Sequence, residues 1–230
     1  NTCGFCNMYK EKKFRIRSLA EILADLTEVS HNPYAPYIEK VFLADGDALV
    51  MKTEDLLVIL DAIHRLYPGV KRVASYGTAQ DILRKSEEEL IRLREAGLGI
   101  VYVGAESGDN EILKYINKGV TAEQTIEAGQ KLKRCGIATS VTLISGLGGR
   151  SKVEEHALSC AKLITAMNPE YAPFLTLRLY EGTPMYADVV EGRFQRITPD
   201  EIVDEMEIFL KNVDSPGTVF RTNHASNYVI

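Results

Sequence analysis

The sequence lacks the features that several classes of protein require. No apolar run approaches the roughly 20 residues of a membrane-spanning helix, and no signal peptide is visible. Four cysteines in a chain of 230 residues are too few for a disulfide scaffold. A formal net charge of −5 argues against a protein that wraps nucleic acid. We therefore expect a cytoplasmic protein with free thiols, no membrane contact and no indicated nucleic-acid partner.

The remaining composition is typical of a folded α/β protein. Hydrophobic residues make up 45% of the chain and charged residues 26%, which is ordinary for a globular domain. Short apolar runs bounded by turn signals predict strands at Tyr37–Leu43, Val70–Tyr76, Gly99–Val103, Ile137–Ile144 and Phe174–Leu179. Helix-start signals stand between or after them at Thr53, Ser86, Thr121, Ser151 and Thr198. This alternation predicts a parallel sheet with outer helices, either open or curled into a barrel.

The chain begins with a pair of cysteines, Cys3 and Cys6, in the sequence Cys-Gly-Phe-Cys. Two thiolates at this spacing can hold one metal centre, and cysteine thiolates are the usual ligands of iron–sulfur clusters. A third ligand has to come from elsewhere. The same spacing allows a zinc-binding or thiol-redox protein, although the histidines show no matching ligand spacing at His31, His64 or His156.

Polar and glycine residues follow two of the predicted strands, where ligands bind in parallel α/β sheets. Asp45, Gly46 and Asp47 follow the first. Glycine lets a ligand approach the backbone, and carboxylates accept from an ammonium, but a plain turn is the alternative. Glu106 follows the third strand and can accept two hydroxyl groups, while Lys118 offers a point charge to a carboxylate. A capped helix with a C-terminal cation is the alternative there.

The strand Ile137–Ile144 leads into the glycine-rich run Ser145–Gly149. Such a run can cradle a phosphate at a helix N-terminus, so a cluster-free (β/α) nucleotide-binding protein is a competing interpretation. The run has neither the G-K-S/T ending of a Walker A loop nor the G-x-G-x-x-G dinucleotide pattern.

Three further features receive mainly structural interpretations. Cys135 and Cys160 stand alone in helical segments and are expected to be buried structural thiols. The cationic segment Lys10–Arg17 is interpreted first as a solvated face, and otherwise as a surface that attracts an anionic substrate or redox partner. His224 is the best general acid or base candidate away from the cysteines, yet single histidines are more often structural.

The order of these landmarks resembles the radical S-adenosylmethionine (SAM) enzymes. Cys3, Phe5 and Cys6 match the second cysteine, the aromatic residue and the third cysteine of their C-x-x-x-C-x-Φ-C signature. The first cysteine would stand two residues before Asn1, so we expect a chain truncated inside this motif. The stretch from Glu106 is similar to the E-S-G block of the branch that includes oxygen-independent coproporphyrinogen oxidases and related tRNA-modifying enzymes.

The resemblance implies a fold and a domain organisation. We expect an α/β fold of the partial (β/α)6 TIM-like barrel type, with parallel strands, outer helices and the first strand before Asn1. Residues 1–197 would form the radical SAM core. Residues 198–230 would add a helix and a strand, the latter at Thr218–Arg221, to the same domain.

The resemblance also implies cofactors, a four-iron–four-sulfur ([4Fe-4S]) cluster and SAM. Cys3 and Cys6 would bind the cluster, and Phe5, the aromatic residue of the motif, would contact a cofactor. Gly46 and Asp47 would meet the SAM amino group, although the family motif there is of the G-G-E type. The ribose, carboxylate and adenine would contact Glu106, Lys118, Thr142, Ile144, Gly146 and Leu179.

The function implied by the resemblance is reductive cleavage of SAM at the cluster to a 5′-deoxyadenosyl radical, which takes a hydrogen atom from a substrate. The resemblance further implies a reducing partner such as flavodoxin or ferredoxin. The substrate, small or macromolecular, and any catalytic acid or base are left open by the sequence.

Overall fold

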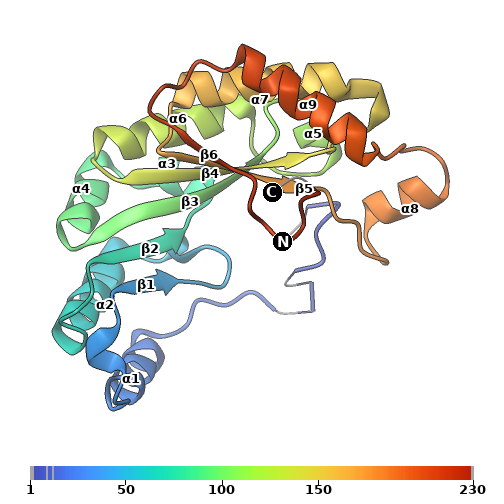
Figure 1. Ribbon diagram of the computed structural model, residues 1–230. Helices are drawn as coiled ribbons and strands as arrows, with labels where there is room; N and C mark the ends of the chain where they lie inside the picture. The colour runs from blue at the N-terminus through green and yellow to red at the C-terminus, as the bar shows by residue number, and fades with distance from the viewer. Residues whose placement is uncertain (1–2, 9, 12, 229–230) are drawn as a thin grey trace. The chain divides into compact units, whose positions relative to one another are not determined.

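A computed structural model of the chain describes residues 3–8, 10–11 and 13–228. Its six strands form one sheet in the order β1-β2-β3-β4-β5-β6, and helices follow the strands along the chain (Figure 1). The strand pairings within each of the two units described below are parallel. The predicted α/β class, with parallel strands and outer helices, is confirmed. The six observed strands all lie within the chain and include the short β6, whereas the prediction placed the first of its six strands before Asn1.

The chain divides into two compact units. Unit 1 comprises Asn1–Lys13, Gly104–Gly129 and Ser140–Ile230, and unit 2 comprises Phe14–Val103 and Gln130–Thr139.

Unit 2 is built on three parallel strands. β1 (Lys40–Leu43) pairs with β2 (Arg72–Tyr76), which pairs with the first part of β3 (Leu98–Glu106). The helical elements of this unit are α1 (Leu19–Ser30), η1 (Ala35–Tyr37), η2 (Ala48–Val50), α2 (Thr53–Leu66), α3 (Ala79–Arg84) and α4 (Glu87–Glu95). Capping boxes start α1 at Ser18 and α4 at Ser86, because each serine is followed three residues later by a glutamate that closes the box.

The core of unit 2 lies between its strands and helices. Apolar residues three or four positions apart on α2 and α4 face inward, so each helix buries one stripe. The fully buried residues of this core, which include residues of α3 and β3, are among others Leu56, Ile59, Ile63, Ile82, Leu90, Leu93 and Ile100.

Unit 1 contains the end of β3, most of β4 (Ala138–Ser145), β5 (Tyr171–Thr176) and β6 (Val219–Arg221). β4 pairs with β5, and β5 pairs with β6. Its helical elements are α5 (Asn110–Tyr115), the first part of α6 (Ala122–Arg134), η3 (Arg150–Lys152), α7 (Val153–Met167), α8 (Pro184–Val190) and α9 (Pro199–Asn212). α7 and α9 lie side by side (Figure 1).

The core of unit 1 joins these helices to the strands. Phe174 of β5, Phe209 of α9 and Phe220 of β6 form a chain of edge-to-face rings, with centroids 4.7 and 5.7 Å apart. The same cluster takes in buried residues of α5 and α7, so the loops between these elements rest on a packed base.

Most predicted helices and strands are observed within a few residues of the expected bounds, including β6 at the run Thr218–Arg221. Two strand predictions need correction. The first strand begins at Lys40, because Ala35–Tyr37 with Pro36 forms a 3-10 turn. The strand predicted at Phe174–Leu179 is instead Tyr171–Thr176: its centre holds Pro173, a residue that usually marks a strand boundary.

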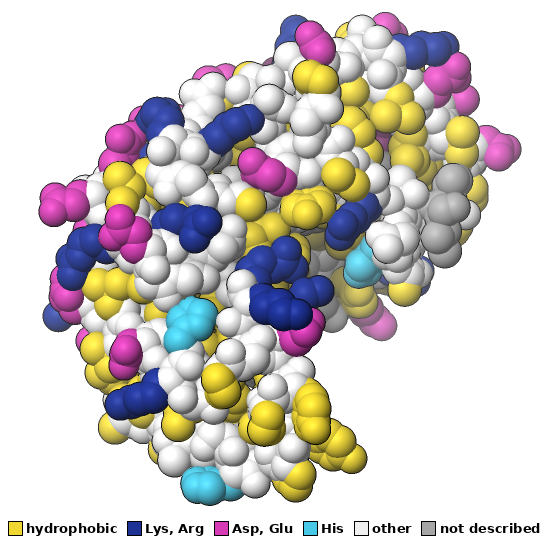
Figure 2. Space-filling model, turned by 60° about the vertical axis from the view of Figure 1, so that its left-hand side comes forward, with side chains coloured by type: hydrophobic (Ala, Val, Ile, Leu, Met, Phe, Trp, Pro, Cys, Tyr) yellow, Lys and Arg dark blue, Asp and Glu magenta, His cyan; other side chains and the backbone are white. Residues whose placement is uncertain are grey.

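Acidic, basic and apolar side chains are intermixed on the face shown in Figure 2. Among the described residues, every helix falls short of the length and apolar character that a membrane span requires.

Candidate functional site

The cysteine loop is anchored at Gly4. The Gly4 N–H donates to the carbonyl of Ile116 at 2.8 Å, and the Gly4 carbonyl accepts from the N–H of Met185 at 3.1 Å. Within the loop, the Cys6 N–H donates to the Cys3 carbonyl at 3.3 Å. Both backbone groups of one glycine therefore tie the loop to the end of α5 and the start of α8.

The two thiols of this loop are half-buried and free of disulfides. Phe5 stands between them and packs against the hydrophobic core of unit 1. Phe5 thus turns one side of the loop into the core, while Cys3 and Cys6 stay partly exposed. This geometry gives Phe5 a packing role in the loop; contact with a cofactor stays a prediction.

An ion pair lies beside the cysteine loop. The Lys118 Nζ is 2.8 Å from Glu106 Oε1, and only 16% and 13% of the two side chains are exposed. Gly104 makes room for this pair, because a Cβ at that position would lie 2.3 Å from Glu106 Oε1 and 3.2 Å from Lys118 Nζ. The sequence analysis missed Gly104; its signal was a glycine two residues before the end of a strand.

The ion pair and the thiols interact electrostatically. Burial raises the pKa of the Cys3 thiol, and the Lys118 ammonium opposes that rise. Burial alone would lower the pKa of Lys118, but the Glu106 carboxylate and the Cys3 thiol outweigh it, so the pKa of Lys118 is raised. Lys118 is therefore a retained positive charge close to two thiols, and Glu106 is its ion-pair partner.

The backbone of Glu106 adopts an uncommon conformation, with a φ of 67°. For a residue with a Cβ, the left-handed region costs on the order of 1–3 kcal/mol and is found preferentially at functional sites. Asn117, with a φ of 53°, makes a similar turn just before Lys118. Both partners of the ion pair are thus held by unusual backbone turns.

The residues predicted to meet the adenine lie in the same unit. Thr142 and Ile144 share one face of β4, because side chains two apart point the same way. Gly146 follows with a φ of 84°, and its N–H donates to Glu205 Oε2 at 2.9 Å. Leu179 lies beyond β5 and packs against the core of unit 1.

The predicted Gly46 and Asp47 belong to unit 2. Asp45 and Gly46 have φ values of 70° and 104°, which make a tight turn after β1. Asp47 caps η2 by accepting from the Leu49 N–H at 3.0 Å, and it also accepts from the Thr78 N–H at 3.2 Å. Burial, together with a hydrogen bond to Asp81, raises the pKa of Asp47 to about 6.

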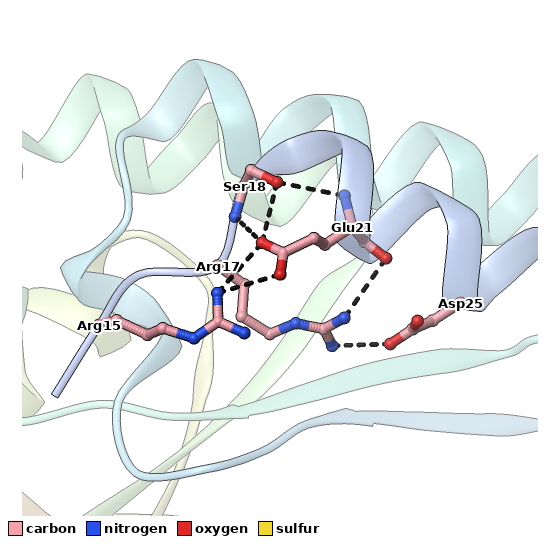
Figure 3. Close-up of polar contacts among 5 residues, drawn as sticks. All are labelled: Arg15, Arg17, Ser18, Glu21 and Asp25. Carbon is pink, nitrogen blue, oxygen red and sulfur yellow. Dashed lines mark hydrogen bonds and ion pairs between the residues drawn. The ribbon is translucent and has the colours of Figure 1, made fainter. Parts of the chain in front are cut away.

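The cationic segment Lys10–Arg17 is partly neutralised by α1. Arg15 pairs with Glu21 at 3.0 Å and Arg17 pairs with Asp25 at 2.6 Å (Figure 3). Backbone and side-chain hydrogen bonds from Ser18, followed by Arg15, lower the pKa of Glu21 to about 2. These contacts support the interpretation as a solvated face. Lys12 of this segment lies outside the described residues.

His224 takes part in a local turn. Its Nδ1 lies 2.8 Å from Ser226 Oγ and accepts from the Ser226 N–H at 3.1 Å. Ser226 and Asn227 in turn accept from the N–H of Thr176 at the end of β5. This arrangement gives His224 a structural task in holding the tail against β5.

A second polar cluster in unit 1 was missed from the sequence. His156 Nδ1 lies 2.7 Å from Glu205 Oε1, and His156 Nε2 lies 3.4 Å from Cys160 Sγ. All three side chains are buried; for Cys160 this fulfils the expectation of a structural thiol. The signal was Glu205 itself, a carboxylate in the same helical stripe as the buried Ile202 and Phe209.

Within the described part of the chain, no group of three or more His, Cys, Asp or Glu side chains could hold a metal ion. Cys3 and Cys6 supply two thiols, and Lys118 supplies a buried positive charge beside them. Thiolates suit an iron–sulfur cluster, and the cation suits an anionic ligand, so the residues present fit part of such a site. The fold and site define an α/β protein with a thiol-and-cation site next to the end of a parallel strand.

Residues 1–161 match the family model of the radical SAM superfamily, and the chain therefore belongs to that superfamily. The predicted resemblance is confirmed, and with it the class of enzyme. Membership implies SAM and, typically, a [4Fe-4S] cluster as cofactors.

Several relatives support this assignment. A tRNA uridine(34) acetyltransferase of Methanocaldococcus infernus is 32% identical over 124 residues, which are 52% of this chain and 22% of that protein. The heme chaperone HemW of Bacillus subtilis is 21% identical over 223 residues, 94% of this chain and 57% of that protein. The structure of the radical SAM methyltransferase TsrM from Kitasatospora setae shares the fold, with a TM-score of 0.71 at 18% identity, over 96% of this chain and 52% of that one. The chain thus spans less than two thirds of each.

Proposed function

We propose that this chain is the core of an enzyme that cleaves SAM reductively at a [4Fe-4S] cluster bound in part by Cys3 and Cys6. The observation that carries this proposal is the nearly buried Lys118–Glu106 pair, 2.8 Å apart, placed beside the two thiols of a family-matched loop. When bound, the cluster and SAM would together supply the radical chemistry that removes a hydrogen atom from the substrate.

In this proposal, the chain's own residues hold the cysteine loop in place and orient the groups that would contact SAM. Gly4 fixes the backbone of the cysteine loop through its N–H and its carbonyl. Lys118 presents an ammonium to a carboxylate, and Glu106 presents acceptor oxygens to hydroxyl groups. Because each is now the partner of the other, binding of SAM would exchange their ion pair for contacts with the ligand.

Gly46 and Asp47 would serve the amino group of SAM, because Gly46 leaves the backbone open and Asp47 offers a carboxylate. Thr142, Ile144, Gly146 and Leu179 would line the adenine side. A third thiolate has to come from outside the described residues, and the electrons from a reducing protein such as flavodoxin or ferredoxin.

The test is anaerobic cluster reconstitution of the full-length protein, with iron and sulfide counted. We expect about four of each per chain in the wild type, and release of 5′-deoxyadenosine when SAM and a strong reductant are added. Cys3→Ala and Cys6→Ala should lose the cluster and keep the fold.

Cys135→Ala is the matched control, because Cys135 is a buried thiol of unit 2. It should retain iron at the wild-type level. Full iron content in Cys3→Ala or Cys6→Ala, or stoichiometric zinc in the wild type, would contradict the proposal and favour a zinc or thiol-redox protein.

A further inference from the structure

The loop after β3 rests on helix α7. The N–H of Gly108 donates to Cys160 Sγ at 3.4 Å. A Cβ at Gly108 would lie 2.1 Å from the carbonyl oxygen of Ser159, so the loop and the helix backbone are in direct contact. Glu106 stands two residues before this contact, and its side chain faces Lys118.

The loop after β4 rests on the same helix and on α9. The N–H of Gly146 donates to Glu205 Oε2 at 2.9 Å. A Cβ at Gly148 would lie 3.0 Å from the Cβ of His156 and 2.9 Å from the carbonyl oxygen of Lys152. This loop is therefore supported by the polar end of Glu205 and by the side chain of His156.

The two supports are joined to each other. Glu205 Oε1 contacts His156 Nδ1 at 2.7 Å, and His156 Nε2 contacts Cys160 Sγ at 3.4 Å. The connected path runs from the Gly146 N–H through three side chains to the Gly108 N–H; we name these three, Glu205, His156 and Cys160, the His156 bridge. His156 and Cys160 are 2% exposed and Glu205 is 4% exposed.

A Cys–His–Glu arrangement also occurs in hydrolytic enzymes, where the thiol is a nucleophile. Burial argues against that use here. The cavity beside the bridge, lined by Ser145, Phe174 and Met206, is no larger than a water molecule. A substrate cannot reach Cys160, so the bridge acts on the structure around it.

Burial also explains why the bridge is well defined. A buried polar group without a partner is costly, so each member strongly favours the geometry that keeps its contacts. Among the described residues, no buried side-chain nitrogen or oxygen lacks a hydrogen-bond partner. A displacement of either loop would break the hydrogen bond that its backbone N–H, of Gly108 or of Gly146, donates to one end of the bridge.

We infer that the His156 bridge is a set of positioning residues that holds the loops 106–108 and 144–146 in a fixed relation to each other. This inference rests on the proposed function, in which Glu106 of one loop and Ile144 and Gly146 of the other contact SAM. The bridge itself would touch neither cofactor. It would set the spacing between the ribose-facing and adenine-facing residues from behind.

Hydrogen–deuterium exchange of the full-length protein tests the bridge without any cofactor. In Glu205→Gln the side chain keeps its size but loses its charge and one acceptor. We expect the Gly146 amide to exchange roughly 10- to 100-fold faster, the factor for loss of a hydrogen bond to a charged acceptor. A smaller acceleration should appear at Gly108, because the link through His156 is weakened.

Glu207→Gln is the matched control. It makes the same chemical change on the same helix, where the exposed Glu207 pairs with Lys211 at the surface. Exchange in both loops should stay at the wild-type rate. Cys160→Ala is a second, milder variant that should accelerate exchange at Gly108 first, and it keeps the test valid if Glu205→Gln does not fold.

Wild-type exchange at Gly146 in Glu205→Gln and at Gly108 in Cys160→Ala would overturn the inference, as would equal acceleration throughout the core strands of unit 1. SAM affinity of the cluster-loaded variants separates the inference from the proposed function. If the loops loosen and SAM binds at least tenfold more weakly, while Glu207→Gln is unchanged, both stand. If the loops loosen and SAM affinity is unchanged, the bridge stands as a loop support, and the assignment of these loops to SAM fails.

Discussion

Replacing Lys118 by methionine would leave the Glu106 carboxylate without its ion-pair partner. Only 13% of the Glu106 side chain is exposed, so water cannot fully replace the ammonium. Breaking a buried pair by removing one partner costs about 3–5 kcal/mol. Because both side chains retain some exposure, we expect a loss near the lower end, about 3 kcal/mol.

The double variant Glu106→Gln with Lys118→Met removes both charges. The remaining amide and thioether need no counter-ion, and replacing a whole buried pair by neutral groups is often nearly neutral. We therefore expect the double variant to be within about 1 kcal/mol of the wild type in unfolding free energy. The stability lost in the single variant should thus return when the second charge is removed.

The assay is urea unfolding of the wild type, both single variants and the double variant at one pH, with free energies extrapolated to water. The cycle isolates the coupling between the two side chains. If the unfolding free energy of Lys118→Met lies within about 0.5 kcal/mol of the wild-type value, the reasoning is refuted. An unpaired buried carboxylate should destabilise the fold by more than that.

Binding of SAM separates stability from function in the same four proteins. In the proposed function, the Lys118 ammonium contacts the carboxylate of SAM, and a stable fold without Lys118 lacks this contact. The double variant should therefore recover stability without recovering affinity. Full SAM affinity in the double variant would show that the pair is structural only.

Three further outcomes are expected. Asp47→Asn should remove a pH dependence: burial and Asp81 raise the Asp47 pKa to about 6, so this carboxyl stabilises the fold below about pH 4 and loses that effect as pH rises through 6. Between pH 4 and pH 7 the unfolding free energy of the wild type should therefore fall relative to that of the variant. After a reduction for solvent screening, we expect this relative change to be about 1–2 kcal/mol. Gly108→Ala should cost about 2 kcal/mol or more in chemical unfolding through overlap with α7, whereas Gly217→Ala, whose Cβ would meet nothing nearer than 3.7 Å, should cost little. His156 has a raised pKa, because its contacts outweigh burial; its advantage over His156→Gln in thermal unfolding should be larger at pH 6 than at pH 9.

Local signals in the sequence predict the elements whose ends are chemically marked. Ser86 with Glu89 and Thr198 with Glu201 start helices where the pattern places them, because capping depends on residues three apart. The predicted bounds of β5 were wrong because a proline such as Pro173 usually marks a strand boundary. The actual position of β5 is set by its pairing with β4 and β6. Such pairing joins residues far apart in the chain, which no local pattern contains.

The candidate site divides in the same way. Cys3 could be selected because two cysteines at this spacing suit a metal centre, and Glu106 and Lys118 could be selected because their stretch resembles a family motif. Glu205 could not, because its partners are distant: Gly146 lies 59 residues away and His156 lies 49 residues away. A carboxylate in an apolar stripe indicates that a partner exists, but only the packing of α9 against α7 reveals which one.

The position of Lys118 shows how the two kinds of information combine. Ile116 accepts the Gly4 N–H, and Lys118 follows two residues later, after the left-handed turn at Asn117. The segment that anchors the cysteine loop is therefore the segment that carries the cation. Any movement of the end of α5 would shift the loop and the ammonium together, so their separation is protected from fluctuation of that helix. A site that must keep thiolates and a positive charge at a fixed distance is well served by this shared attachment to the end of α5, because preorganised charges need no rearrangement when an anionic ligand arrives.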